Sequence, residues 1–457
     1  NTSVAVTATN SSTPQYVDNT EKPSEVNLPV APDRIRRSAR LLITNHALWA
    51  GHPATQTVTQ LSLPDGQLLW QMNVGCEPIT LSRASPKLFA TCFDTGEVVV
   101  IGEDTGEILD RTFVGNGPLG ILVVEDFVFV TLNGESMLVK LGINALDTIS
   151  RVETGSSPSG MAVKDERLFV VHTSDDDVIV FDIQSLHRIG TIPIGDQSVM
   201  AESITLHRSD PRAYVPQQRQ NVANMARLFD TTVFPVVTVL DTDDFALKVR
   251  ETLALDSIDT PVGMPTAAVF NEQEDLLNVV NASSDDLSVV GLTQEPAAGH
   301  IVVGQNPRDL AISSGGDLAY TLNLVSDDIS VIDTITLKIV NTFPLVIDAR
   351  PNFIQEGERL FFTSRPTEIS KDNWMSCASC HSDGGTDGQT WLGTARGPRN
   401  TPILRGIANT EPLHWSADRA DIQAFQQTFT GLMAGDGLSD RDLDTLSQYI
   451  NTLQPHS

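Results

Sequence analysis

The chain has few positive charges, few cysteines and no long apolar run. Its 457 residues include 30 Lys and Arg against 58 Asp and Glu, so the formal net charge is −28. Such a surface repels phosphate groups, which argues against nucleic acid and anionic membranes as partners. No run approaches the roughly 18 apolar residues of a membrane-spanning helix. We therefore expect no nucleic-acid partner and no transmembrane segment.

The four cysteines are too few for a disulfide scaffold, and their positions divide them into two pairs. Cys76 and Cys92 flank a predicted hairpin whose turn lies near Ala84. Adjacent antiparallel strands would place the two thiols opposite each other, which predicts a disulfide and an oxidising compartment. Two buried free thiols are the alternative.

Large apolar residues are scarce at the start of the chain. Residues 1–38 are rich in Ser, Thr, Asn and Pro, a composition that predicts a flexible tail or linker. No basic segment followed by an apolar one opens the sequence, so we expect a mature form from which a signal peptide has been removed.

A period of 40 residues governs the segment 39–348. Gly75, Gly115, Gly155 and Gly195 are each 40 residues apart, and the first three begin a Gly-x-x-Pro turn. Short strands rich in Val, Ile, Leu and Phe keep the same phase, and seven units can be counted. Four short strands per unit at this period predict an all-β fold, a seven-bladed β-propeller. An insertion at 217–227 of the fifth unit predicts a protruding loop.

The seventh unit carries the strongest family signal within these repeats. Its strand 319–323 reads Ala-Tyr-Thr-Leu-Asn and is followed by Ser-Val-Ile-Asp-Thr at 330–334. This pair resembles the repeat of YVTN-type propellers, which implies the same fold and leaves the activity open.

Residues 349–457 carry the chemistry. Cys377-Ala378-Ser379-Cys380-His381 is a Cys-x-x-Cys-His motif, in which two thiols attach haem c covalently and the histidine binds its iron. A redox or zinc Cys-x-x-Cys is the alternative, but no βαβ pattern and no further cysteine pair accompany it. We predict one haem c held by a small all-α cytochrome domain, with helices at 357–362, 416–429 and 439–453.

Two residues compete for the sixth iron position. Met433 lies 52 residues after His381 and six before Ser439, a position similar to that of the methionine ligand in class I cytochromes c. His414 ends a run that begins at Arg399 and resembles the R-x-T-P-x-L-R…P-x-x-H segment of the dihaem cytochrome c peroxidase and MauG-like families. The resemblance covers 351–455 and implies that Pro402 belongs to the haem-binding segment, although this chain has a single haem motif.

Charged residues add further candidates. Arg399 and Arg405 could pair with the haem propionates through bidentate contacts. In the propeller, His46, His52 and His172 recur near equivalent repeat positions, a weak resemblance to propellers that bind copper through a ring of histidines. The aspartate runs at 175–177, 285–286 and 327–328 predict Asx-turns, with calcium as the alternative.

Together these patterns predict a periplasmic, extracellular or cell-surface c-type cytochrome. Its haem would transfer electrons, and its propeller would dock a redox partner protein or a small-molecule donor or acceptor. One alternative is an oxidoreductase: a haem peroxidase of the MauG-like kind, or a copper propeller with the haem as relay. The other is an adhesive or scaffold propeller.

Overall fold

The computed structural model describes residues 36–224, 231–257, 260–292, 298–392 and 397–455. The predicted tail at 1–38 lies outside this part of the chain except for its last three residues. Of these, Arg36 and Arg37 form strand β1 (Arg36–Arg37), which pairs with the propeller strand β14.

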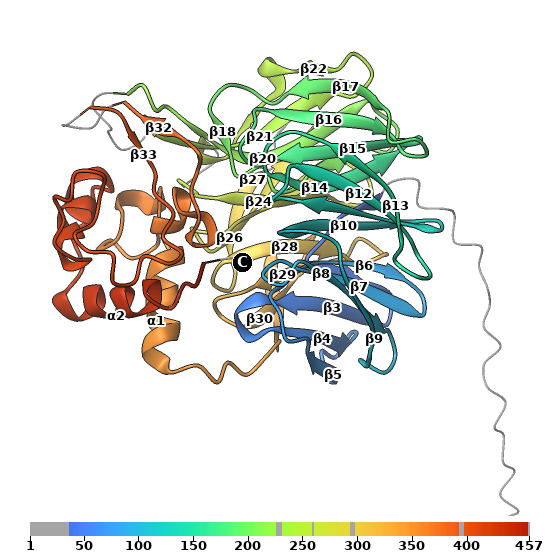
Figure 1. Cartoon of the computed structure of the whole chain (residues 1–457), viewed down its shortest axis with the longest axis horizontal. Coiled ribbons are helices and arrows are strands. Elements are labelled where there is room, and N and C mark those ends of the chain that lie inside the picture. Colours follow the sequence, from blue (N-terminus) through green and yellow to red (C-terminus); the bar gives the residue numbers. More distant parts are fainter. Residues whose placement is uncertain (1–35, 225–230, 258–259, 293–297, 393–396, 456–457) are drawn as a thin grey trace, which may run out of the picture. The chain divides into compact units, whose positions relative to one another are not determined.

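Seven antiparallel sheets form the blades of a β-propeller, as the repeats predicted (Figure 1). Blade one contains β2 (Leu41–Ile43), β3 (Ala47–His52), β4 (Thr57–Ser62) and β5 (Leu68–Asn73). Blade two contains β6 (Pro78–Ala84), β7 (Lys87–Cys92), β8 (Glu97–Gly102) and β9 (Ile108–Phe113). Blade three contains β10 (Pro118–Val124), β11 (Phe127–Leu132), β12 (Met137–Gly142) and β13 (Thr148–Glu153). Blade four contains β14 (Pro158–Lys164), β15 (Arg167–His172), β16 (Asp177–Asp182) and β17 (Arg188–Pro193). Blade five contains β18 (Ser198–Val199), β19 (Thr205–Leu206), β20 (Arg212–Gln220), β21 (Val233–Asp241), β22 (Ala246–Leu247) and β23 (Leu253–Ala254). Blade six contains β24 (Pro265–Phe270), β25 (Leu276–Asn281), β26 (Asp286–Gly291) and β27 (Ala298–Val302). Blade seven contains β28 (Pro307–Ile312), β29 (Leu318–Asn323), β30 (Asp328–Asp333) and β31 (Lys338–Pro344).

The repeat residues explain the blade geometry. Each Gly-x-x-Pro turn leads into an inner strand that starts at its proline, a position where no ladder N–H is needed. A register shift follows that proline in blades two, three, four, six and seven, so the same bulge recurs along the inner strands. Apolar side chains of neighbouring blades pack together, as where Phe89 and Val100 meet Val123 and Val130.

The fifth blade departs from the prediction of a protruding loop at 217–227. Gln217–Gln220 extend β20, which pairs with β21 along nine residues, and residues 225–230 lie outside the described part. Extension of the ladder satisfies backbone groups that a free loop would leave to water.

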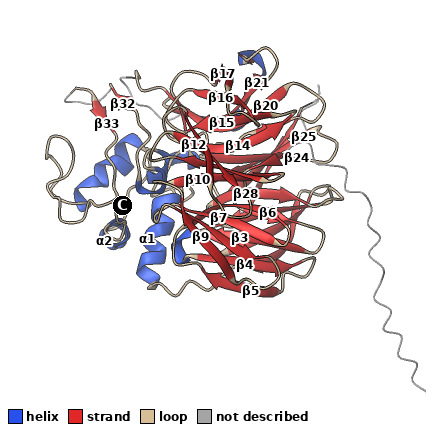
Figure 2. Ribbon diagram, turned by 45° about the vertical axis from the view of Figure 1, so that its right-hand side comes forward, coloured by secondary structure: helices blue, strands red, loops and turns tan. Residues whose placement is uncertain are grey.

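The C-terminal segment packs beside the propeller (Figures 1 and 2). It contains α1 (Asn352–Phe362), α2 (Asp440–Ile450) and the two-stranded pair β32 (Thr390–Trp391) and β33 (Arg399–Asn400). The pair means that an all-α domain is not what the described residues show. The segment and the propeller share one apolar core, in which Phe361 and Trp374 accompany Met200 and Met264.

Short helical turns complete the described structure. The 3₁₀ turns are Pro53–Thr55, Val249–Glu251, Leu255–Ser257, Lys371–Asn373, Cys377–Ser379, Ser382–Gly384 and Gln423–Phe425, and a π turn spans Thr428–Leu432.

The three helices predicted in the C-terminal segment agree with the structure to different degrees. Ser439 caps α2 by accepting a hydrogen bond from Asp442 N, and α1 begins five residues before the predicted 357. The predicted helix at 416–429 is wrong over its first half, because helical structure begins only at Gln423. Within this range Ala417 has a φ of 51°, which interrupts a right-handed helix there.

Candidate functional site

The Cys-x-x-Cys-His motif folds into a tight turn after α1. Ser376 N donates to Ser379 Oγ at 3.0 Å, and His381 N donates to Cys377 O at 3.0 Å. These short-range bonds bring both sulfur atoms and the imidazole to the wall of one cavity. The spacing of the motif alone predicted this proximity.

The two motif thiols are not joined to each other. Burial raises the pKa of the Cys377 thiol to about 12 and raises the pKa of Cys380 as well. A redox Cys-x-x-Cys has a lowered thiol pKa, and a structural zinc site needs four donors. Across the described ranges, no group of three or more His, Cys, Asp or Glu side chains is placed to hold a metal ion. The surroundings therefore favour neutral sulfur, as in a thioether bond to haem.

The cavity has a volume of about 580 Å³, within the range of cofactor sites. Its walls are mostly apolar and aromatic, with polar groups at a few places. Apart from the motif, its lining includes Thr232, Trp391, Arg399, Pro402, Leu404, Ile407, Leu413, His414, Trp415, Arg419, Ile422, Phe425, Phe429, Met433, Leu446 and Ile450.

His381 is held neutral. Burial lowers the pKa of its imidazole to about 4, and nearby backbone of Gly385 and Pro402 offsets only part of this shift. Its Nδ1 is buried and makes no hydrogen bond of normal geometry with any described residue. A neutral imidazole with its lone pair available is the form that binds haem iron. The donor set and the apolar cavity thus fit a haem.

Met433 lies in the wall of the same cavity and is only 2% exposed. It directly follows the π turn, a local irregularity found often at functional sites. Its carbonyl oxygen accepts hydrogen bonds from Trp374 Nε1 at 2.9 Å and from Lys371 N at 3.0 Å. The backbone that carries this thioether is therefore attached to the chain just before the haem motif.

His414 also borders the cavity, in a more open position. Its side chain is 36% exposed, and its Nδ1 lies 3.0 Å from Asp418 Oδ1. The imidazole packs edge-on against Phe425 at 4.7 Å between ring centroids. His414 thus keeps Nδ1 on a carboxylate and is partly exposed, whereas Met433 places a buried thioether at the cavity wall.

The two predicted arginines separate. Arg399 lines the cavity, as does Pro402, and its Nη1 donates to Pro398 O. Arg405 is not among the lining residues; its Nε donates to Asp383 O at 2.9 Å and its Nη2 lies 3.7 Å from Glu77 in the propeller. Arg419 lines the cavity instead and was not predicted, because no motif marks it.

Residues of the fifth blade reach the motif from the propeller. Gln218 Nε2 and Gln220 Nε2 lie 3.2 and 3.4 Å from Ser379 O, and Thr232 lines the cavity. The insertion at 217–227 was the sequence signal for this contact. That this insertion would contact Ser379 could not be predicted from the sequence.

The three propeller histidines do not come together. His46 is exposed in a turn. His52 Nε2 lies 2.7 Å from Asp327 in blade seven, whereas in blade four His172 Nδ1 lies 2.9 Å from Asp177 and its Nε2 lies 2.7 Å from Thr154 Oγ1.

The aspartate runs link neighbouring blades. Asp176 accepts bonds from Gln197 N and Ser198 N, and Asp285 accepts one from Asn306 N. Backbone N–H groups thus occupy these carboxylates where calcium was the alternative.

The predicted disulfide between Cys76 and Cys92 is present, with a Cα–Cα distance of 5.5 Å at one end of the β6–β7 hairpin. Among the helices that the structure describes, none is long and apolar enough to cross a membrane.

Comparison with known proteins separates the two parts of the chain. Residues 351–452 match the family model described as di-haem cytochrome c peroxidase, which implies haem c binding in this segment. A chain of Kuenenia stuttgartiensis hydrazine synthase is similar with a TM-score of 0.57 and 14% identity, over 70% of this chain and 99% of that chain. A protein from Lactobacillus plantarum has a TM-score of 0.53 and 15% identity, over 66% and 97% of the two chains. At these identities the likeness shows the fold alone. No curated protein matches the chain.

The molecule thus combines a seven-bladed β-propeller with a C-terminal segment similar to di-haem cytochrome c peroxidases. Haem-based redox chemistry is the function class that this combination supports.

Proposed function

We propose that this chain is an extracytoplasmic c-type cytochrome with one covalently attached haem that transfers single electrons. Cys377 and Cys380 would hold the haem, and His381 and Met433 would both bind its iron. The observation that carries this proposal is that His381 and Met433, 52 residues apart, line one cavity.

When bound, the haem supplies a one-electron couple at its iron. Cys377 and Cys380 would hold it through thioether bonds, each thiol adding its S–H across one vinyl double bond, which needs no oxidant. The neutral imidazole of His381 would supply its lone pair to the iron, and the Met433 thioether would favour the reduced state and raise the potential. Arg399 and Arg419 line the cavity, and their guanidinium groups would be available to pair with the haem propionates.

The environment of the site suits electron transfer. The aromatic rings of Trp391, Phe425 and Phe429 line the cavity and keep it apolar, which limits the rearrangement of water when the charge changes. The other substrate is a one-electron donor or acceptor, a protein or a small molecule, for which the propeller provides a docking face. The disulfide in the second blade agrees with a periplasmic or extracellular location.

The test is to purify the holoprotein and record its spectra in the ferric and dithionite-reduced states, with a metal count by mass spectrometry. We expect one iron per chain, no stoichiometric copper, a six-coordinate low-spin spectrum, and haem that stays attached after denaturation. Replacement of both Cys377 and Cys380 by Ser should abolish that attachment. Stoichiometric copper, or haem that is absent or released by denaturation, would contradict the proposal.

A peroxidase reaction is the second candidate, and the family match over 351–452 favours it. It requires an iron with one open coordination position, so Met433 would have to be unbound in the ferric protein. Rapid cyanide binding and a high-spin ferric spectrum in the wild type would support this candidate over the first.

A further inference from the structure

The central channel of the propeller is nearly filled. A cavity of about 20 Å³ remains among the inner strands, enough for a single water. Residues 36–40 cross the channel, because β1 pairs with β14 of blade four and Ala39 bridges to Leu81 of blade two. A substrate does not fit in this space, so the charged side chains that line it have another role.

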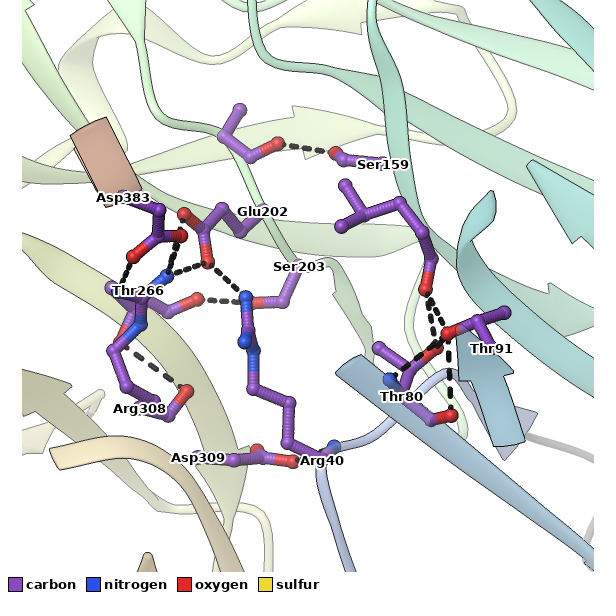
Figure 3. A network of polar contacts seen from close by, with 12 residues as sticks. Arg40, Thr80, Thr91, Ser159, Glu202, Ser203, Thr266, Arg308, Asp309 and Asp383 are labelled. Atoms are coloured by element: carbon purple, nitrogen blue, oxygen red, sulfur yellow. Dashed lines mark hydrogen bonds and ion pairs between the residues drawn. The ribbon is translucent and has the colours of Figure 1, made fainter. Parts of the chain in front are cut away.

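Arg308 forms ion pairs with two carboxylates, those of Glu202 and Asp383 (Figure 3). It comes from β28, and its side chain is only 1% exposed. Its Nη2 donates to both carboxylate oxygens of Glu202 at 3.1 and 3.0 Å. Its Nη1 and Nη2 also donate to Asp383 at 2.8 and 3.0 Å. One buried guanidinium therefore joins the propeller to the segment that follows the haem motif.

The charges balance only when Asp383 is present. Glu202 is shared, because Arg40 Nη2 also lies 3.0 Å from its carboxylate. Asp309 is occupied by Arg37 and by the backbone N–H groups of Arg40 and Leu41. Without Asp383, two buried guanidinium groups would face the single carboxylate of Glu202. An excess buried charge is costly, so the channel favours docking of Asp383.

Asp383 follows His381 by two residues and is fixed on its backbone as well as its side chain. Arg405 Nε donates to its carbonyl oxygen at 2.9 Å, and Gly384 N donates to the carbonyl oxygen of His381 at 2.9 Å. The Asp383 side chain is 45% exposed, and its carboxylate is held by the guanidinium of Arg308. A displacement of Asp383 would move the backbone that carries His381.

We propose that Arg308 is a positioning residue: through Asp383 it holds the imidazole of His381 in place at the haem iron. This inference rests on the proposed function, in which His381 ligates the haem. It assigns a second task to the propeller, because a residue of the seventh blade would control how firmly the iron-binding imidazole is held.

The test compares Arg308→Gln and Asp383→Asn in the full-length holoprotein. The reduction potential and the high-spin fraction of the ferric haem, from electron paramagnetic resonance, are measured for each. A purely electrostatic effect would shift the potential in opposite directions, because one variant removes a positive charge and the other a negative one. A positioning role predicts that both variants raise the high-spin fraction several-fold.

The double variant sharpens the comparison. If Arg308 acts through Asp383, the double variant should have no greater high-spin fraction than the worse single variant. Arg40→Gln is the matched control, because Arg40 shares Glu202 but does not contact Asp383; its spectrum should remain that of the wild type. If Arg308→Gln does not fold, Asp383→Asn decides the question, because its side chain is partly exposed and the amide has the same size.

Wild-type spectra in both single variants, or shifts in potential of opposite sign with unchanged spin state, would overturn the inference. In either case a Met-ligated, covalently attached haem in the wild type would leave the proposed function standing. A wild type without covalent haem would instead refute the proposed function itself.

Discussion

At the residue scale, two side chains of different chemistry, Met433 and His414, line the same cavity as His381. Met433 is a buried thioether, whereas His414 is a partly exposed imidazole paired with Asp418. A soft thioether raises the potential of haem iron, and its removal opens a coordination position. The identity of the sixth ligand therefore determines whether the site carries electrons or activates a small oxidant.

We expect Met433→Ala to abolish the weak far-red charge-transfer band of a thioether-ligated ferric haem. The potential should fall by on the order of 0.1 V, within the roughly 0.8 V that axial ligands span. Cyanide should then bind rapidly, which stopped-flow absorbance would measure. His414→Ala is the control and should behave as the wild type; if the two variants exchange roles, His414 is the ligand.

The hydrogen bond from Trp374 to the carbonyl of Met433 allows a second residue-scale prediction. Trp374→Phe keeps most of the buried ring and removes the N–H donor, at a cost of about 1 kcal/mol. That cost corresponds to a roughly fivefold larger population with Met433 displaced, and so to about fivefold faster cyanide binding. Trp391→Phe is the matched control, because Trp391 lines the cavity but donates to Asp387 and Thr401. Equal rates in both variants would contradict a specific role of Trp374.

At the scale of elements, the β6–β7 hairpin of the second blade is closed by a disulfide. Cys76 and Cys92 are fully buried and close a loop of 16 residues. The chain-entropy model assigns about 3 kcal/mol to a loop of that length. The disulfide therefore stabilises the second blade, which contributes Glu77 to the contact with Arg405.

Replacement of both Cys76 and Cys92 by Ala should lower the melting temperature of the holoprotein, with a loss of about 3 kcal/mol in unfolding free energy. Reduction of the wild type by dithiothreitol should cause a similar loss and have no further effect on the variant. Scanning calorimetry with and without reductant measures both. An unchanged melting temperature of the wild type on full reduction would contradict this account.

At the scale of the whole molecule, buried acids lie where the propeller meets the C-terminal segment. Asp285 accepts a hydrogen bond from Thr363 Oγ1 at 3.1 Å, and Ser364 N donates to Ser283 O at 2.7 Å. Burial raises the pKa of Asp285 and of Asp286 to about 6, although Arg365 opposes the shift for both and His300 for Asp286. The folded protein thus keeps these protons at pH values where an unfolded chain has lost them.

The sign of the pH effect follows from that difference. Between about pH 4 and 6 the folded state binds more protons than the unfolded state, so stability should fall as the pH rises through this window. One pKa unit corresponds to about 1.4 kcal/mol, so each carboxyl accounts for about 1 to 3 kcal/mol. Asp285→Asn should remove its share of the slope in unfolding free energy measured from pH 4 to 7. Asp333→Asn is the control, because hydrogen bonds lower the pKa of Asp333 and keep its titration below this window; a slope unchanged in Asp285→Asn would contradict the assignment.

The sequence by itself determined the features that are local in the chain. The 40-residue period specifies the blades because each strand and turn repeats over a short stretch, and the Cys-x-x-Cys-His spacing brings three donors to one turn by backbone geometry alone. The capping of α2 by Ser439 is equally local. The helix predicted at 416–429 failed over its first half because the positive φ angle at Ala417 leaves no mark in apolar periodicity.

The tertiary structure alone decided which distant residues meet. Only the closed ring of blades brings Arg40, Glu202 and Arg308 to one channel, and only the packing of the C-terminal segment adds Asp383 to them. The same packing takes Arg405 to the propeller and leaves Arg399 and Arg419 at the cavity. Spacing along the chain carries no information about such contacts, because burial and charge balance select partners in space.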